Sequence, residues 1–221
     1  MTIFFPSIVT NGLVLCLDAG NQLSYPGTGT TWNDLSRNGN DGTLTNGPVF
    51  NSGGSMVFDG VNDYIAISDS LQQLQFSIGA FTLSAWIYPA ANKNHAIISY
   101  GSANGYNMYI ASGNYLEFAK ANVANTGSSN SLTPVNLNKW QYATCVVSIN
   151  NNVQFFINGV LKRTANFAYS YAYTNQLRIG DSQNESLFWN GNISNVNVYN
   201  RALTSQEIFS NYLATKGRYK L

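Results

Sequence analysis

Four oxygen-bearing side chains have types and spacing that suit a metal ion. Asp59, Asn62 and Asp63 lie in one short segment around Gly60, and Asp181 follows a separate apolar run. Calcium takes six to eight oxygen ligands, which carboxylates, amides and backbone carbonyls can provide. The segment therefore suggests a structural calcium ion, with Asp181 contributing from another loop. The alternative is that Asp59 and Asp63 form Asx turns around the glycine.

An aromatic stretch, NFAYSYAYTN at 166–175, is a candidate surface for a ligand or partner. If the stretch is extended, one side of it carries four rings, those of Phe167, Tyr169, Tyr171 and Tyr173. These rings could pack inside the fold, contact a partner protein or stack on sugars, because tyrosine combines apolar area with a hydroxyl group. Further aromatic residues expected in exposed loops are Trp189, Tyr100 and Tyr106.

The chain has few side chains that could serve in acid–base catalysis. The only glutamates are Glu117, Glu185 and Glu207; the last fits a helix cap, and the others have no acidic neighbour on the same strand face. A glycosidase needs two carboxyl groups roughly 5 to 10 Å apart. The single histidine, His95, is expected in an exposed turn and lacks the partners of a zinc site or catalytic triad. We therefore expect no enzyme activity.

The composition excludes several classes of protein. The 221 residues carry a net charge of +1, charged residues make up 10% of the chain, and there are 31 asparagines. This balance disfavours a nucleic-acid binder, and the absence of a run of about 18 apolar residues disfavours membrane insertion. Amide and hydroxyl side chains favour turns over long surface helices. Cys16 and Cys145 each lie in an apolar run, which favours buried thiols, although the sequence leaves their pairing undecided.

Short apolar runs separated by Asn-Gly and Asp-Gly pairs predict β-strands joined by tight turns. About a dozen strands in two sheets are expected from this spacing. Besides a hairpin around Asn158 and Gly159, we place strands at about 13–18, 56–59, 64–67, 81–88, 96–99, 108–111, 116–119, 140–149, 177–180 and 193–199.

The hairpin has a specific expected register. A two-residue turn places Ile157 opposite Val160, Phe156 opposite Leu161 and Phe155 opposite Lys162. Val160 then shares one apolar face with Phe155 and Ile157. In the last strand, a β-bulge near 194–195 is needed to keep the apolar residues of 193–198 on one face.

Residues 204–217 predict a C-terminal helix, and a second, shorter helical turn is expected around 71–74. Thr204 and Glu207 have the spacing of a capping box, and Gly217 suits a helix end. Between them, apolar residues at helical spacing form a stripe: Ile208, Phe209, Tyr212 and Leu213. The helix should lie on the sandwich.

Several segments occur together in a familiar order. They are FDGVNDYI from Phe58, FTLSAWIYP from Phe81, WQYAT from Trp140, FFINGV from Phe155, LRIGD from Leu177 and FWNGNISNVNVYNRALTSQEI from Phe188. On these segments the chain resembles laminin-G-like members of the concanavalin A-like lectin/glucanase superfamily, including laminin-G-like proteins among phage structural gene products. The resemblance implies an all-β jelly-roll sandwich of two antiparallel sheets, often with calcium at its rim, and a binding or adhesive role. The Glu-x-Asp-x-x-Glu strand of the superfamily's glycosidases is missing here.

We expect three parts: an N-terminal arm at 1–12, the laminin-G-like domain at 13–214 and a short basic tail at 215–221. The arm could be a docking strand or an ordinary edge strand. The start of the chain lacks the pattern of an export signal, which favours a protein assembled in a host cytoplasm over an extracellular one. The leading hypothesis is a non-catalytic phage virion protein, such as a capsid decoration, fibre or tail-associated module. Its partners would be neighbouring subunits or copies of itself, and also host-cell glycans.

Two alternatives belong to other classes. The first is a calcium-dependent carbohydrate-binding lectin, and the second is a polysaccharide-active hydrolase. The calcium at 59–63 is the only cofactor that the sequence suggests.

Overall fold

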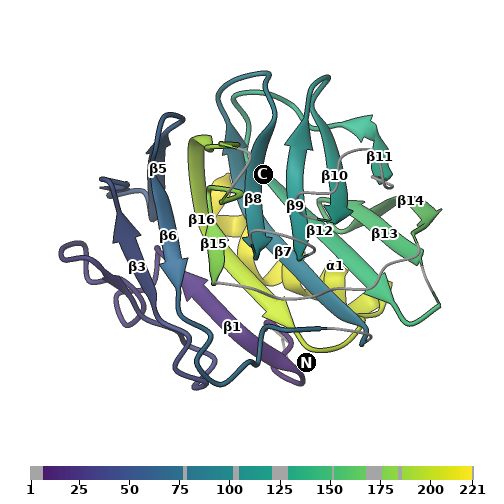
Figure 1. Ribbon diagram of the computed structural model, residues 1–221, viewed down its shortest axis with the longest axis horizontal. Coiled ribbons are helices and arrows are strands. Elements are labelled where there is room, and N and C mark those ends of the chain that lie inside the picture. The colour runs from purple at the N-terminus through teal and green to yellow at the C-terminus, as the bar shows by residue number, and fades with distance from the viewer. Residues whose placement is uncertain are drawn as a thin grey trace, which may run out of the picture.

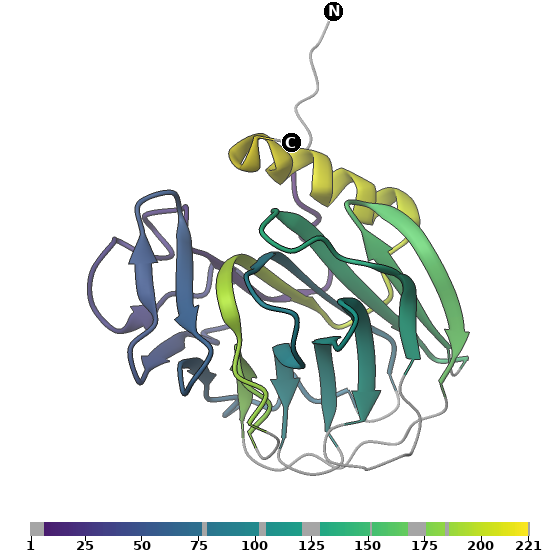
Figure 2. The same ribbon diagram turned by 90° about the horizontal axis from the view of Figure 1, so that it is seen from above.

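Two antiparallel β-sheets pack face to face, and one C-terminal helix lies against the outside of one of them (Figures 1 and 2). The structure, a computed structural model, describes residues 7–76, 79–101, 105–120, 129–150, 152–167, 176–183 and 186–220. Within these ranges the expected two-sheet jelly-roll sandwich with a short terminal helix is confirmed. No helix in the described part of the chain is long and apolar enough to span a membrane.

Sheet 1 has eight strands. From one edge to the other it runs β14 (Val160–Asn166), β13 (Asn152–Ile157), β12 (Gln141–Ser148), β7 (Phe81–Pro89), β16 (Asn190–Tyr199), β5 (Ser55–Asp59) and β4 (Val49–Asn51). The eighth strand, β1 (Leu13–Asp18), pairs with the second half of β16, beyond the part that pairs with β5.

Sheet 2 also has eight strands. Its order is β11 (Ser129–Pro134), β10 (Tyr115–Lys120), β9 (Tyr106–Ala111), β8 (His95–Tyr100), β15 (Leu177–Ile179), β6 (Tyr64–Ile67), β3 (Gly42–Thr45) and β2 (Thr31–Trp32). The strands β2, β3, β4 and β11 were not expected from the sequence, because they are short or polar and carry little hydrophobic periodicity.

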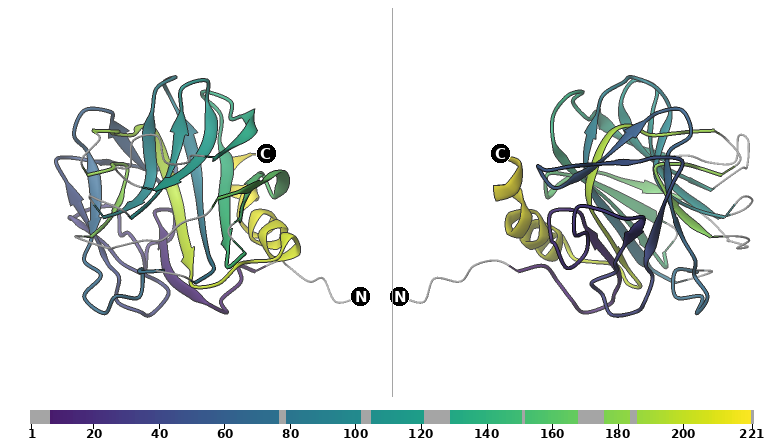
Figure 3. Two further views of the ribbon diagram at one scale, coloured as in Figure 1. Left: turned by 45° about the vertical axis from the view of Figure 1, so that its right-hand side comes forward. Right: turned by 90° about the vertical axis from the view of Figure 1, so that its left-hand side faces the viewer.

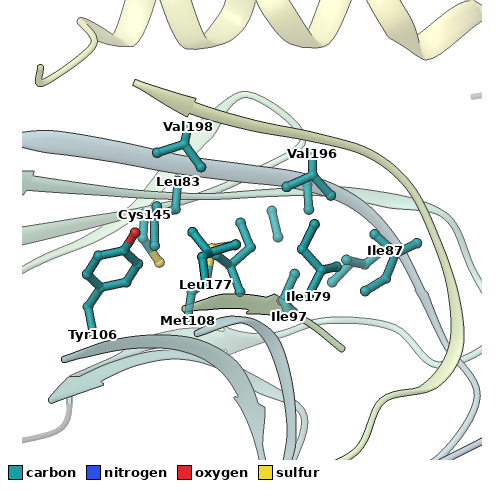
Figure 4. Close-up of a cluster of buried hydrophobic side chains, with 14 of the residues drawn as sticks. Leu83, Ile87, Ile97, Tyr106, Met108, Cys145, Leu177, Ile179, Val196 and Val198 are labelled. Carbon is teal, nitrogen blue, oxygen red and sulfur yellow. The ribbon is translucent and has the colours of Figure 1, made fainter. Parts of the chain in front are cut away.

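The core fills the space between the sheets (Figure 4). Alternation along the strands sends every second side chain inward. Sheet 1 contributes Leu83, Ile87, Cys145, Val196 and Val198, and sheet 2 contributes Ile97, Tyr106, Met108, Leu177 and Ile179. The two cysteines are buried and free, so the expectation of unpaired thiols is confirmed. Burial raises the pKa of Cys16 to about 12, which leaves its thiol un-ionised and a poor nucleophile.

The expected bulge in β16 is confirmed. Its pairing with β7 shifts register between Ile193 and Val196, and both of these side chains are fully buried. One extra residue restores the inward face. Near the start of the strand, Gly191 has a φ of +128°, and a Cβ there would lie 2.1 Å from the carbonyl oxygen of Tyr88. Only glycine allows β16 and β7 to approach this closely.

The β13–β14 hairpin differs from its expected register by one residue. Ile157 pairs with Val160 and Phe156 with Leu161 as expected, but Phe155 pairs with Arg163 and not with Lys162. The cause is a bulge between Phe155 and Phe156, which the turn sequence does not encode. Val160 does not join the buried face; it is 52% exposed, at the turn end of an edge strand.

Helix α1 (Ser205–Thr215) and the 3₁₀-helix η1 (Lys216–Tyr219) cover part of the outer face of sheet 1 (Figure 3). The capping box is confirmed: the Glu207 amide donates to Thr204 Oγ1, and the Thr204 amide donates to the Glu207 carboxylate. Of the predicted stripe, Ile208 is fully buried, whereas Phe209 is 39% exposed. Phe209 leans over the hairpin turn, where a Cβ on Gly159 would lie 2.9 Å from its ring.

The two terminal segments contact this helix region. Residues 7–12 form no strand, and the Val9 amide donates to Asn211 Oδ1 at 2.8 Å while its carbonyl accepts from the Tyr199 hydroxyl at 3.0 Å. In the expected basic tail, residues 216–219 form η1, whose Tyr219 is buried and whose Arg218 pairs with Asp18. The described part of the tail is therefore integrated into the fold.

Candidate functional site

The loop 59–63 forms the Asx turn that was the alternative to calcium. Asp59 Oδ1 accepts from the amides of Val61 and Asn62, and Asp63 Oδ2 accepts from the Asp59 amide. Desolvation raises the pKa of the buried Asp63 carboxyl. The Lys93 ammonium donates to the Gly60 carbonyl at 2.8 Å, which already places a positive charge on this loop.

Asp181 is also engaged. It is buried, and its Oδ2 accepts from Arg178, whose guanidinium lies 4.1 Å from the ring centroid of Tyr64. Its Oδ1 has no hydrogen-bond partner among the described residues. The described residues contain no group of three or more His, Cys, Asp or Glu side chains placed to hold a metal. One carboxylate oxygen of Asp59 and one of Asp63 also accept backbone amides, so this donor set is a poor fit for calcium, which stays a prediction from the sequence.

The expectation of an exposed His95 and an exposed Trp189 was wrong. His95 begins β8 and is fully buried, and its ring stacks on that of Trp189 with centroids 4.2 Å apart. The Asn190 amide donates to His95 Nδ1 at 3.3 Å. Burial, and after it the charge of Lys93, lower the pKa of His95 to about 3. Trp189 is likewise fully buried, which removes it from the candidate ligand surface.

The other candidate aromatics are also interior where the structure describes them. Phe167 is buried and meets Phe118 edge-on, with ring centroids 5.4 Å apart. This contact supports the interior alternative for Phe167, the first aromatic residue of the stretch. Tyr100 and Tyr106, expected in loops, lie buried on β8 and β9. Tyr169, Tyr171 and Tyr173 lie outside the described residues.

The glutamates are dispersed. Glu117 is buried on β10, Glu207 is paired with Arg201 at the start of α1, and Glu185 lies outside the described residues. The hydrogen bond from Arg201 is the main cause that lowers the pKa of Glu207 to about 2. A carboxylate held ionised by an arginine is a poor general acid at neutral pH.

An open aromatic patch instead lies on the outer face of sheet 1. Asn192 of β16 pairs with Tyr88 of β7, and Trp140 directly precedes Gln141, which pairs with Ile87. The strand period therefore places Trp140, Tyr88 and Asn192 side by side in one row. The Tyr88 and Trp140 rings lie 5.6 Å apart and are inclined by 59°. All three side chains are half-buried.

The end of the C-terminal helix explains why this row stays open. The preceding outward residue of β7, Trp86, is covered: its Nε1 donates to Thr215 Oγ1, and its ring stacks on Tyr219 with centroids 3.9 Å apart. Tyr219 also contacts Trp140, with centroids 4.9 Å apart. The chain thus covers Trp86 and leaves the next pair of rings half-exposed, with Tyr219 fixing the orientation of Trp140.

A cavity of about 320 Å³ lies at this row. We call it the outer-face cavity; it is lined by Tyr88, Trp140, Asn192, Asn51, Ser55 and Gly53. The Asn192 side-chain amide donates from Nδ2 to Ser55 Oγ at 3.0 Å, which orients both groups. The lining therefore combines two aromatic rings with amides and a hydroxyl, and none of the described side chains in it is charged.

Sequence reasoning missed this site. The available signal was in 81–88, where Trp86 and Tyr88 follow one another on the face opposite the core residues Phe81, Leu83 and Ile87. A strand with bulky residues on both faces must be covered on both, and a short helix can cover only part of the second face. The uncovered part of the outer face also includes Trp140 and Asn192, but this follows from strand pairings between distant segments, which the sequence does not reveal.

A second cavity of about 400 Å³, the edge cavity, adjoins the end of β4. Its lining includes Gln22, Tyr25, Phe50, Ser52 and Arg218. The rings of Tyr25 and Phe50 lie 5.2 Å apart.

A family model described as the concanavalin A-like lectin/glucanases superfamily matches residues 59–209, more than half of the chain. The protein belongs to this superfamily. The resemblance stated from the sequence is thereby confirmed at the level of the superfamily. No curated protein matches the chain.

Solved structures of similar fold include an enzyme and two binding domains. A mutant of Trypanosoma rangeli sialidase displaying trans-sialidase activity superposes with a TM-score of 0.71 and 17% identity, covering 96% of this chain and 34% of that one. The botulinum neurotoxin serotype D binding domain gives 0.70 and 15%, covering 94% and 53%. The binding domain of Paraclostridial Mosquitocidal Protein 1 gives 0.68 and 15%, covering 92% and 52%.

These likenesses show the fold alone. This superfamily member spans about a third to a half of the length of those chains. The segment that carried the resemblance has a structural role here: Gly191 permits the close strand approach, Ile193 enters the core, and Arg201 pairs with the capping residue Glu207. The lectin-like sandwich is thus established, whereas the nature of a ligand depends on the side chains that this chain presents on its surface.

Proposed function

We propose that this protein is a carbohydrate-binding module and that the outer-face cavity is its ligand site. The observation that carries the proposal is the half-exposed pair Tyr88 and Trp140 beside the polar groups of Asn192, Asn51 and Ser55. A sugar ring has apolar C–H faces and a rim of hydroxyl groups. Aromatic rings match the faces, and amides and hydroxyls match the rim, since an amide both donates and accepts hydrogen bonds.

The lining favours binding without turnover. None of the described residues that line the outer-face cavity is an acid, a histidine or a cysteine. Glycoside hydrolysis needs a carboxyl pair at the sugar, and the glutamates at 117 and 207 do not line this cavity. These facts support an adhesive role and not a hydrolytic one.

A glycan array with purified protein tests this proposal. We expect saturable binding to a defined set of glycans and at least about a tenfold loss of affinity in Trp140→Ala, because central aromatic contacts in an interface typically contribute most of its energy. Trp140→Phe keeps a ring and should retain part of the binding. Tyr115→Ala, which removes another half-buried aromatic on sheet 2, is the matched control and should bind like the wild type.

Two results would count against the proposal in different ways. A wild-type protein that binds no glycan would remove carbohydrate binding itself. A Trp140→Ala variant that folds, by its melting curve, and keeps the wild-type glycan profile would remove the outer-face cavity as the site.

We also infer, as a second role, attachment to a neighbouring protein subunit. An exposed apolar patch surrounds the β13–β14 turn, with Val160, Leu161 and Phe209 exposed by 52%, 43% and 39%. Clustered exposed apolar side chains suit a protein contact. The phage virion role, with virion partners and assembly in a host cytoplasm, is the finer form of this proposal and rests on the sequence resemblance. Its test is the protein's presence at fixed stoichiometry in purified particles; its absence from such particles would contradict it.

A further inference from the structure

The two cavities flank one turn. Gly53, in the 52–54 turn that joins β4 to β5, lines both the outer-face cavity and the edge cavity. With about 320 and 400 Å³, each lies at the lower end of the usual range for small-ligand sites. A ligand that lies across this turn would reach both.

The edge cavity repeats the chemistry of the outer-face cavity. Its aromatic pair is the half-buried Phe50 and the buried Tyr25, and Gln22 and Ser52 are exposed polar groups on its lining. The Tyr25 hydroxyl donates to the Gly29 carbonyl at 2.7 Å, which fixes the ring in place. Aromatic area, an amide and a hydroxyl are again combined, as a second sugar ring would require.

The charge of the lining indicates a neutral ligand. Among the described residues, Arg218 is the only charged side chain that lines either cavity, and it makes a bidentate ion pair with Asp18. Its guanidinium also packs against Gly20, where a Cβ would lie 2.6 Å from the guanidinium carbon. In this bidentate pair, Asp18 occupies the guanidinium N–H groups of Arg218 that would otherwise bind the carboxylate of an acidic sugar.

The 52–54 turn between the cavities is fixed by contacts of Gly54 with neighbouring segments. A Cβ on Gly54, whose φ is +85°, would lie 2.8 Å from the Cα of Gly20, so the two backbones touch. The Gly54 carbonyl accepts from Ser194 Oγ, which in turn accepts from the Tyr219 hydroxyl at 2.8 Å. A surface fixed in this way loses little entropy when an extended ligand binds.

We infer that, given the proposed carbohydrate-binding function, the ligand is an extended neutral oligosaccharide that crosses the 52–54 turn and occupies both cavities. The outer-face cavity holds one end on Tyr88 and Trp140, and the edge cavity holds the next sugars on the half-buried ring of Phe50, which the buried Tyr25 supports. Acidic sugars gain nothing from Arg218, because Asp18 neutralises it.

The test compares short and long ligands by calorimetry. The probes are cello-, malto-, xylo-, manno- and chito-oligosaccharides of two and six residues, together with any neutral glycan that the array identifies and its disaccharide fragment. In the wild type the long member of the recognised series should bind at least about tenfold tighter than the short one. Raising NaCl from 50 to 500 mM should change the affinity less than about twofold, because no unpaired charge is involved.

Two exposed lining residues provide variants that should fold normally. Ser52→Tyr places a bulky side chain on the turn and Gln22→Ala removes a polar contact; both should weaken the long ligand and leave the short one unchanged. Gln206→Ala, an exposed glutamine on α1 away from both cavities, is the matched control and should behave as the wild type.

The outcomes separate this inference from the proposed function. Equal affinities for short and long ligands, with binding still dependent on Trp140, would overturn the extended ligand and keep the outer-face site. Binding that is tightest for sialylated or uronic-acid glycans and falls steeply with salt would overturn neutrality. No binding of any glycan would overturn the proposed function itself.

Discussion

Acidification to pH 5 should destabilise this protein through one residue, His95. Its ring is fully buried against Trp189, and its Nδ1 accepts a hydrogen bond from the Asn190 amide. The pKa is about 3 in the folded protein and 6.5 for the unfolded side chain. Because the folded pKa is lowered, the stabilisation is complete above pH 6.5 and is lost as the pH falls toward 3.

The size of the effect follows from proton linkage. Between these two pKa values the unfolded chain binds one more proton than the native protein, so the free energy of unfolding falls by about 1.4 kcal/mol per pH unit. From pH 7 to pH 5 the His95 contribution falls by about 2 kcal/mol. For a domain of this size, that change lowers Tm by roughly 4 to 8 °C.

The assay is thermal or urea unfolding at pH 5, 6 and 7 for the wild type and for His95→Phe. The chain has one histidine, so no other imidazole titrates in this range. Phenylalanine keeps a ring against Trp189 but cannot be protonated, so the variant should lose most of the pH dependence whatever its absolute stability. A wild-type Tm that is flat from pH 7 to 5, or an equal slope in the variant, would refute the reasoning.

Three further predictions concern stability. Glu207→Gln should lower the free energy of unfolding by about 1 kcal/mol at pH 7, since the Arg201 pair and the capping box are partly exposed. Because the pKa of Glu207 is lowered in the folded protein, the difference between variant and wild type in urea titrations should shrink as the pH falls from 4.5 to about 2. Gly54→Ala should cost about 2 kcal/mol, whereas Gly53→Ala, without a positive φ, should cost less than about 1; equal losses in denaturant titrations would contradict the contact with Gly20. Melting curves in EDTA and in 1 mM CaCl₂ should coincide within about 1 °C, because one carboxylate oxygen of Asp59 and one of Asp63 already accept hydrogen bonds from backbone amides. A clear upward shift with calcium would restore the metal site.

Features set by local rules could be predicted from the sequence. The capping box at Thr204 and the bulge between Ile193 and Val196 depend on residues a few positions apart. The central place of β7 was visible because both of its faces carry bulky apolar residues. These signals, with the motif order, were enough for the two-sheet sandwich.

Features set by long-range packing could not be predicted in this way. The polar segment before His95 suggested an exposed turn, but β8 begins at His95 itself and stacks it on Trp189, 94 positions further along the chain. The bulge beside Phe156 moved the partner of Phe155 by one residue, although the turn was identified correctly. The outer-face cavity joins Asn51, Tyr88, Trp140 and Asn192 from four separate segments, and only the sheet order brings them together.

The indole N–H signals in the ¹⁵N NMR spectrum offer the most direct test of the proposed ligand site. The chain has four tryptophans, and Trp140 alone is half-exposed, because Trp32, Trp86 and Trp189 are fully buried. During titration with the glycan that binds best, the Trp140 indole signal should shift strongly while the other three move little. A shift at Trp189, which precedes Asn190, the partner of Asp59, with Trp140 unchanged would contradict the proposed site and move the ligand to the 59–63 loop.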